Sequence, residues 1–117
     1  MAKKQEITIE KFELYPYVDM PEKKGKAMSI WQETTKNFIN LAKKIKNHGF
    51  EPVENGCEVS FAVHSKKKLS EESLINSVQT VLLFSGVIQS ADQIKKWGKT
   101  LAHKDKESRV IISIKEI

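Results

Sequence analysis

The chain has 117 residues, of which 39% are hydrophobic and 30% charged, and its formal net charge is +5. This length predicts a single domain over residues 1–117 and excludes a large multidomain enzyme. The longest apolar run, from Val81 to Phe84, is far shorter than the roughly 20 residues that a membrane-spanning helix needs. Since no signal peptide is visible and Cys57 is the single cysteine, we expect a cytoplasmic protein without disulfides and without a membrane partner.

The positive charge comes almost entirely from lysine, because Arg109 is the only arginine. Lysine acts as a point charge, whereas arginine favours bidentate contacts with phosphate and guanine. If the chain binds nucleic acid, we therefore expect contacts to the backbone more than to base edges. The alternative is that the lysines serve only solubility, since a net charge of +5 is ordinary for a small domain.

The first half of the chain predicts one strand and one helix. Apolar residues alternate over residues 5–14 with a change of phase near Glu10, which indicates a strand with a bulge. Residues 15–28 contain prolines, a glycine and several lysines, and they predict a long loop of a kind that is usually functional or mobile. Ser29 is a suitable N-cap for the helix that follows, and Gly49 is a suitable residue to end it.

The second half predicts a strand, a helix and two more strands. Residues 57–64 alternate between apolar and polar, as a half-buried strand does. Ser70 is expected to cap a helix that ends at Gly86, and strands are expected over 93–103 and 108–116. The predicted fold is an α+β two-layer domain, in which two helices cover a mixed sheet of about four strands in the order β-α-β-α-β-β.

Three carboxylates are the candidates for catalysis. We expect the histidines at the surface and Cys57 in the core, and together they lack the spacing of a zinc site. The sequence also contains no glycine-rich phosphate loop. Glu71, Glu72 and Asp92 could hold magnesium for phosphodiester cleavage if the start of the second helix lies near Asp92. The alternative is that the two glutamates complement the helix dipole and that Asp92 lies in a solvated turn.

Four lysine-rich segments are candidates for contacting nucleic acid, and one of them contains a tryptophan. Trp97 lies between lysines in a predicted strand and could stack on an unpaired base, or it could pack inward while the lysines face water. Another of the four, residues 43–46, lies at the predicted end of the first helix. The candidate nucleic-acid-binding residues are Lys23, Lys24, Lys26, Lys66, Lys67, Lys68, Lys95, Lys96, Trp97 and Lys99.

Several segments occur in an order and spacing that resembles the RusA-like Holliday-junction resolvases. That family has a D-x-D-N-L-x-K motif opening a helix, a D-D-x-Q-(I/V) motif after it, and a closing strand of β-branched residues. The corresponding segments here are Ser70-Glu71-Glu72-Ser73-Leu74-Ile75-Asn76, Ser90-Ala91-Asp92-Gln93-Ile94 and Arg109-Val110-Ile111-Ile112-Ser113-Ile114, preceded by the basic segment Met20-Pro21-Glu22-Lys23-Lys24-Gly25-Lys26. The resemblance covers residues 5–117.

The resemblance implies a small, basic, cytoplasmic homodimer, often encoded by a prophage, that acts in DNA recombination and repair with Mg²⁺ as its cofactor. A two-fold dimer suits a four-way junction, which has the same symmetry. The sequence offers the apolar region around Phe12, Tyr15 and Tyr17 for such a dimer.

The departures from the family motifs concern the metal site. Ser70, Ser90 and Ala91 stand where the family has aspartates, and Asn76 stands where it has lysine, while Glu72 keeps a carboxylate. Fewer carboxylates bind magnesium less well but repel phosphate less. Glu71 and Asp92 could substitute, although each lies one residue away from its motif position.

Three functions remain open from the sequence. The first is a DNA-binding relative of the resolvases that recognises branched or junction DNA and lacks nuclease activity or is impaired in it. The second is an active Mg²⁺-dependent, structure-selective endodeoxyribonuclease that uses Glu71, Glu72 and Asp92. The third is a protein-binding regulator or inhibitor, of the type that phages and prophages encode, built on the same fold.

Overall fold

The computed structural model describes residues 4–117 and confirms the predicted α+β class and order of elements. Residues 1–3 of the predicted domain lie outside the described residues. The elements are β1 (Lys4–Glu10), α1 (Lys26–His48), β2 (Cys57–Ser65), α2 (Glu71–Ser85), the short 3₁₀ helix η1 (Ala91–Gln93), β3 (Ile94–Lys104) and β4 (Arg109–Glu116).

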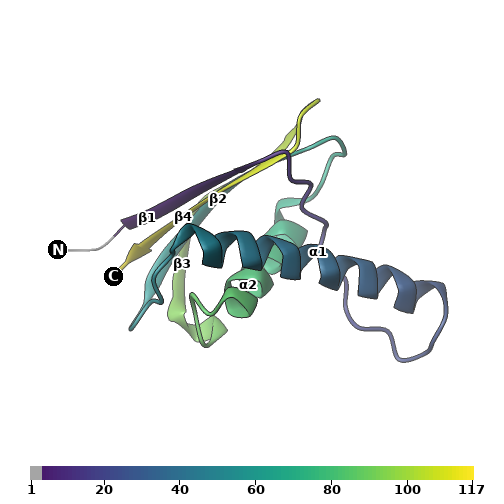
Figure 1. Ribbon diagram of the computed structural model, residues 1–117, viewed down its shortest axis with the longest axis horizontal. Helices are drawn as coiled ribbons and strands as arrows, with labels where there is room; N and C mark the ends of the chain where they lie inside the picture. Colours follow the sequence, from purple (N-terminus) through teal and green to yellow (C-terminus); the bar gives the residue numbers. More distant parts are fainter. Residues whose placement is uncertain (1–3) are drawn as a thin grey trace.

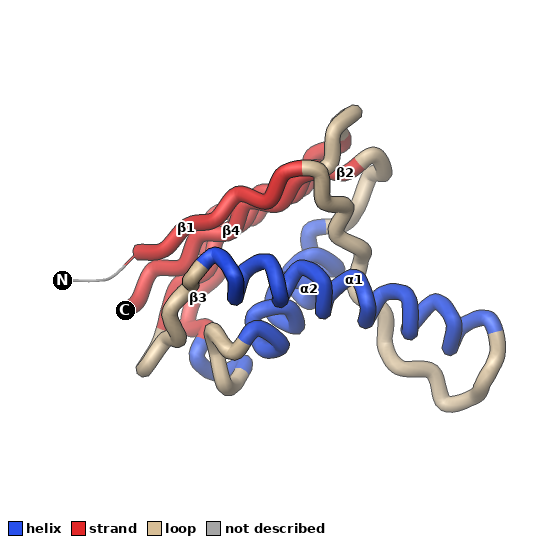
Figure 2. Tube along the Cα trace, in the orientation of Figure 1, coloured by secondary structure: helices blue, strands red, loops and turns tan. Residues whose placement is uncertain are grey.

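The four strands form one mixed sheet in the order β1-β4-β2-β3. β2 and β3 are parallel and are joined through α2, whereas β4 runs antiparallel to both β1 and β2. Both helices lie on the same side of the sheet, so its other face is uncovered by any described element (Figure 1, Figure 2). Neither α1 nor α2, the two α-helices within residues 4–117, is long and apolar enough to cross a membrane.

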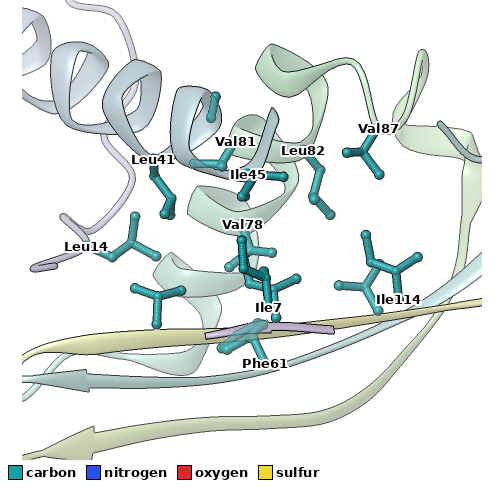
Figure 3. Close-up of a cluster of buried hydrophobic side chains, with 14 of the residues drawn as sticks. Ile7, Leu14, Leu41, Ile45, Phe61, Val78, Val81, Leu82, Val87 and Ile114 are labelled. Carbon is teal, nitrogen blue, oxygen red and sulfur yellow. The ribbon is translucent and has the colours of Figure 1, made fainter. Parts of the chain in front are cut away.

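The core lies between the sheet and the two helices, as Figure 3 shows. Alternate residues of β2 face the helices and are buried, and alternate residues of β4 do the same, because successive side chains of a strand point to opposite faces. Burying one such side chain contributes about 1.5–3 kcal/mol. The core residues of these strands and helices include Val59, Phe61, Val63, Val110, Ile112, Ile114, Leu41, Ile45, Val78 and Leu82.

The first strand is shorter than predicted and contains no bulge. It ends at Glu10, and Lys11 has a φ of 54°, a left-handed conformation that turns the chain away from the sheet. Phe12 and Leu14 are nevertheless buried in the core. The change of phase in the apolar pattern therefore marks the point where the chain leaves the sheet.

The first helix begins earlier than predicted. Its N-cap is Gly25 rather than Ser29, and Ser29 lies inside the first turn, where its hydroxyl donates to the carbonyl of Gly25 at 3.4 Å. The other predicted ends are confirmed. Ser70 caps α2 by accepting from the backbone N–H of Ser73, and Gly49 and Gly86 end their helices in the left-handed conformation.

The loop between β1 and α1 is tied to both helices near its beginning. The Asn37 side chain accepts from the N–H of Tyr15 at 2.9 Å and donates to the carbonyl of Glu13 at 2.8 Å. The hydroxyl of Ser77, on α2, donates to the carbonyl of Tyr15 at 2.8 Å. Three hydrogen bonds thus hold the backbone of residues 13–15 in place.

Replacing Asn37 should destabilise the protein. In the Asn37→Ala variant, the N–H of Tyr15 and the carbonyl of Glu13 lose their partner, which costs about 1–3 kcal/mol of unfolding free energy. Asn40→Ala, an exposed position on the same helix, is the matched control. Urea denaturation followed by circular dichroism measures both variants, and equal stability of the two would contradict the role given to Asn37.

Candidate nucleic-acid interface

The carboxylates predicted for catalysis lie at opposite ends of α2. Glu71 and Glu72 form its first turn, whereas Asp92 lies in η1, beyond its last residue. A helix of 15 residues is about 22 Å long. The sequence left open whether one chain brings the start of α2 near Asp92, and the structure separates them. Within residues 4–117 no group of three or more His, Cys, Asp or Glu side chains is placed to hold a metal ion.

Two serines at the family's aspartate positions have structural roles here. Ser70 is the N-cap of α2, and the Ser90 hydroxyl accepts from the N–H of Asp92 at 3.2 Å at the start of η1. Gln93 completes the capping box of η1, and its amide also donates to the carbonyls of Val53 and Asn55 at 3.0 Å. Ser70, Ser90 and Gln93 thus stabilise helix ends and loops in this structure.

The C-terminal ends of β2 and β3 bring lysines from two loops together. The N–H of Asp105 donates to the carbonyl of Ser65 at 2.8 Å, which holds the start of the β3–β4 turn against the last residue of β2. A hollow of about 470 Å³ between the loops is lined by Lys66, Lys104, Asp105 and Lys106. We call the resulting basic surface the lysine edge, which consists of Lys66, Lys67, Lys68, Lys104 and Lys106.

Lys104 and Lys106 were not among the residues singled out from the sequence. They alternate with acidic residues in a turn, a pattern that is typical of a solvated loop. Their proximity to Lys66 depends on the parallel pairing of β2 and β3, which no local signal reveals.

A stacked pair of histidines lies beside the lysine edge. His64 and His103 are opposite each other in the parallel pair, with ring centroids 4.8 Å apart, and Arg109 is opposite His64 in β4. His64, expected at the surface, has a side chain that is only 14% exposed, and its Nδ1 lies 3.1 Å from Oδ2 of Asp105. The hydrogen bond from His64, followed by those from the backbone of Glu107 and Lys106, lowers the pKa of Asp105.

The remaining predicted lysines lie elsewhere on the molecule. Lys26 is the first residue of α1, and Lys23 and Lys24 lie in the loop just before it, at the end of the helix that extends well beyond the sheet in Figure 1. The other group, at β3, is exposed, and its members are Lys95, Lys96 and Lys99. The predicted basic segments therefore do not form one continuous surface.

The lysines of β3 have neighbours of their own. Nζ of Lys96 lies 4.0 Å from Oε2 of Glu58, and the aliphatic stem of Lys95 covers Gly56. Lys99 borders a shallow hollow on the uncovered face of the sheet, together with Ser60 and Ile111.

Trp97 packs inward, which is the alternative that the sequence left open. Its ring meets the ring of Phe61 edge to face, with centroids 6.1 Å apart, and the side chain packs against the core. In the sheet register Trp97 pairs with Val59, a residue of the face that the helices cover. Trp97 is consequently not presented as a stacking platform.

No protein-family model matches the sequence, and a search of curated proteins finds no match. The resemblance to the RusA-like resolvases therefore remains a likeness of motif order and spacing.

The bond between His64 and Asp105 predicts a pH dependence of stability. Because the folded protein lowers the pKa of Asp105 below its ordinary 3.8, the carboxylate contributes stability above that pH and loses the contribution as the pH falls through the lower, folded value. We expect Asp105→Asn to be less stable than wild type at neutral pH, with a difference that shrinks at acid pH. Urea denaturation at pH 3 to 7 measures this.

The matched control is Glu22→Gln, which removes an exposed carboxylate from the loop before α1. A difference between wild type and Asp105→Asn that does not change with pH would show that the bond to His64 does not stabilise the folded state.

Proposed function

We propose that the protein binds the phosphate backbone of DNA through the lysine edge and that its preferred targets are branched or junction DNA. The single observation that carries this proposal is that Lys66, which follows β2, lines one hollow together with Lys104 and Lys106, at the end of β3 and in the turn after it. Lysines held in a fixed group release counterions from DNA together, and this release supplies most sequence-independent affinity. The motif order of the RusA-like resolvases supports DNA as the ligand.

The shape of the molecule supports a branched target. The described residues span 49 Å in the longest direction, and α1 carries its own lysines to the end that lies away from the sheet. A linear duplex that contacts the lysine edge need not reach Lys23 and Lys24. Where two duplex arms diverge, each arm can contact one of the two basic groups.

We further propose that two copies associate through an apolar surface on α1 and α2. Phe84 is 50% exposed and Ile39 is 40% exposed. Phe84 borders two hollows of about 300 and 280 Å³, the second of which is also lined by Tyr17, Met20 and Trp31. A surface that carries a protruding ring beside a hollow of suitable size can pair with a second copy of itself, as a two-fold interface requires.

This surface overlaps only in part with the one expected from the sequence, because Tyr17 lines its second hollow. Phe12 is buried in the core and cannot contribute, while Tyr15 and Tyr17 are exposed. The sequence pattern does not predict that Phe84 is exposed, because Phe84 directly follows other apolar residues of the predicted helix.

The two alternative functions have less support from the geometry. Magnesium-dependent cleavage by one chain needs carboxylates that lie together, and those of residues 71, 72 and 92 do not. A protein-binding regulator would use the exposed apolar surface around Phe84, and a second copy is the partner that matches its adjacent ring and hollows.

The first test is a salt titration of DNA binding. Fluorescence anisotropy compares a four-way junction with a linear duplex of equal length in EDTA. We expect tighter binding of the junction, and we expect the triple variant Lys66→Gln, Lys67→Gln, Lys104→Gln to reduce the slope of log Kobs against log salt by about 2–3. Repetition with Mg²⁺ and a denaturing gel should reveal no cleavage.

The matched control for this titration changes the same charge elsewhere, in the triple variant Lys36→Gln, Lys44→Gln, Lys115→Gln, all of which are exposed. An equal loss in both variants would mean that the lysine edge has no special role. Absence of any binding at low salt would overturn the proposal as a whole.

The second test concerns association. Phe84→Asp places a charge on the proposed apolar interface, so we expect a dimeric wild type and a monomeric variant in size-exclusion chromatography with light scattering. Ile117→Asp, at an apolar residue that is 70% exposed, should remain dimeric. A wild-type monomer at all concentrations would refute the interface.

A further inference from the structure

A hollow of about 370 Å³ lies between the segment after β1, the first turns of α1 and the β2–α2 loop. Its volume falls in the range of small-molecule sites, and most of its wall is apolar, as in such sites. Glu13, Thr34, Ser65, Lys66 and Lys67 add a few polar groups. The apolar lining residues are Leu14, Tyr15, Pro16, Val18, Ile30 and Leu69.

The walls of the hollow are held by hydrogen bonds. Oε1 of Glu13 accepts from the hydroxyl of Ser108 at 2.8 Å and from the N–H of Lys66 at 3.3 Å. The hydroxyl of Ser65 accepts from the N–H of Lys67 at 3.1 Å. With the bonds from Asn37 and Ser77 to residues 13–15, these contacts form the site before any ligand binds, which lowers the entropy lost on binding.

The other carboxylate oxygen of Glu13 has no partner. Oε2 is buried, and within residues 4–117 it accepts no hydrogen bond. A buried acceptor without a donor is unfavourable, so a ligand that supplies an N–H gains from satisfying it. Carboxylates accept in this way from the exocyclic amino group of cytosine. Because Oε2 is buried in the structure, the Glu13 side chain must rotate for this oxygen to meet such a donor at the hollow.

The hollow borders the lysine edge. Lys66 lines both this hollow and the neighbouring one formed with Lys104 and Lys106. A ligand seated among the apolar residues would thus have cations at its exposed side, where a nucleotide carries its phosphate.

We propose that this hollow binds one unpaired nucleobase of the DNA, with Tyr15, Pro16 and Leu69 against the ring, Glu13 accepting from an exocyclic amino group, and Lys66 and Lys67 contacting the flanking phosphates. The inference rests on the proposed function and adds to it a preference for unpaired bases. Single strands, and branch points at which pairing is interrupted, offer such bases without the free energy that extrusion from a duplex requires.

The test uses three fluorescein-labelled decanucleotides of equal charge: one of cytidines, one of thymidines, and one of cytidines with abasic sites at its central positions. Anisotropy at low salt should show that the cytidine strand binds about 10-fold more tightly than the abasic one, because a bound base contributes about 1–3 kcal/mol. We expect the thymidine strand, which lacks an exocyclic amino group, to bind more weakly than the cytidine strand.

Two variants and one control make the test specific. Glu13→Gln should remove the preference for cytidine over thymidine. Ile30→Trp, at a residue that is 47% exposed, should fill the hollow and remove the preference over the abasic strand without breaking a hydrogen bond of the wall. Glu10→Gln removes an exposed carboxylate on β1 and should change neither preference.

The outcomes separate this inference from the proposed function. Equal affinity for all three strands, with junction binding intact, would overturn the base site and leave backbone binding in place. Absence of binding to the strands and to the junction alike would overturn both. Preferences that persist in Ile30→Trp would place the base elsewhere and also overturn the inference.

Discussion

The structure depends on the alternation of apolar residues along the two central strands, β2 and β4. One face of each strand is buried against α1 and α2, and this burial orients the whole sheet. A shift of one residue would expose the core and bury the polar residues of the other face. Because the register is held so firmly, the loops at the ends of these strands have fixed positions, and the lysine edge is built from two of those loops.

Local sequence signals predict the helices and strands well, but they do not predict which of these elements and loops lie next to one another. Ser70, Gly49 and Gly86 act within a few residues, and each ends or begins a helix where the sequence indicates. Ser29 is a wrong prediction of the N-cap, because the helix already begins after Gly25, which adopts a positive φ. The elements and the fold class could therefore be predicted, with errors of a few residues at their ends.

The site could be predicted only in part, because it is made by contacts between residues far apart in the sequence. Lys66 and Lys67 stand out as a basic run, but nothing local shows that Lys104 lies near them. Glu72 and Asp92 are only 20 positions apart, yet the intervening helix separates them. Asn37 bonds to the backbone of residues 13 and 15, which lie in a loop. No local propensity predicts the path of that loop past α1.

The central position of β4 has a consequence for the order of folding. β4 is synthesised after every other element, yet it is the partner of both β1 and β2. Until it emerges from the ribosome, β1 has no neighbour in the sheet and β2 can pair only with β3. The helices and the β2–β3 pair can form early, whereas closure of the sheet must wait, which is typical of slow-folding chains with distant contacts.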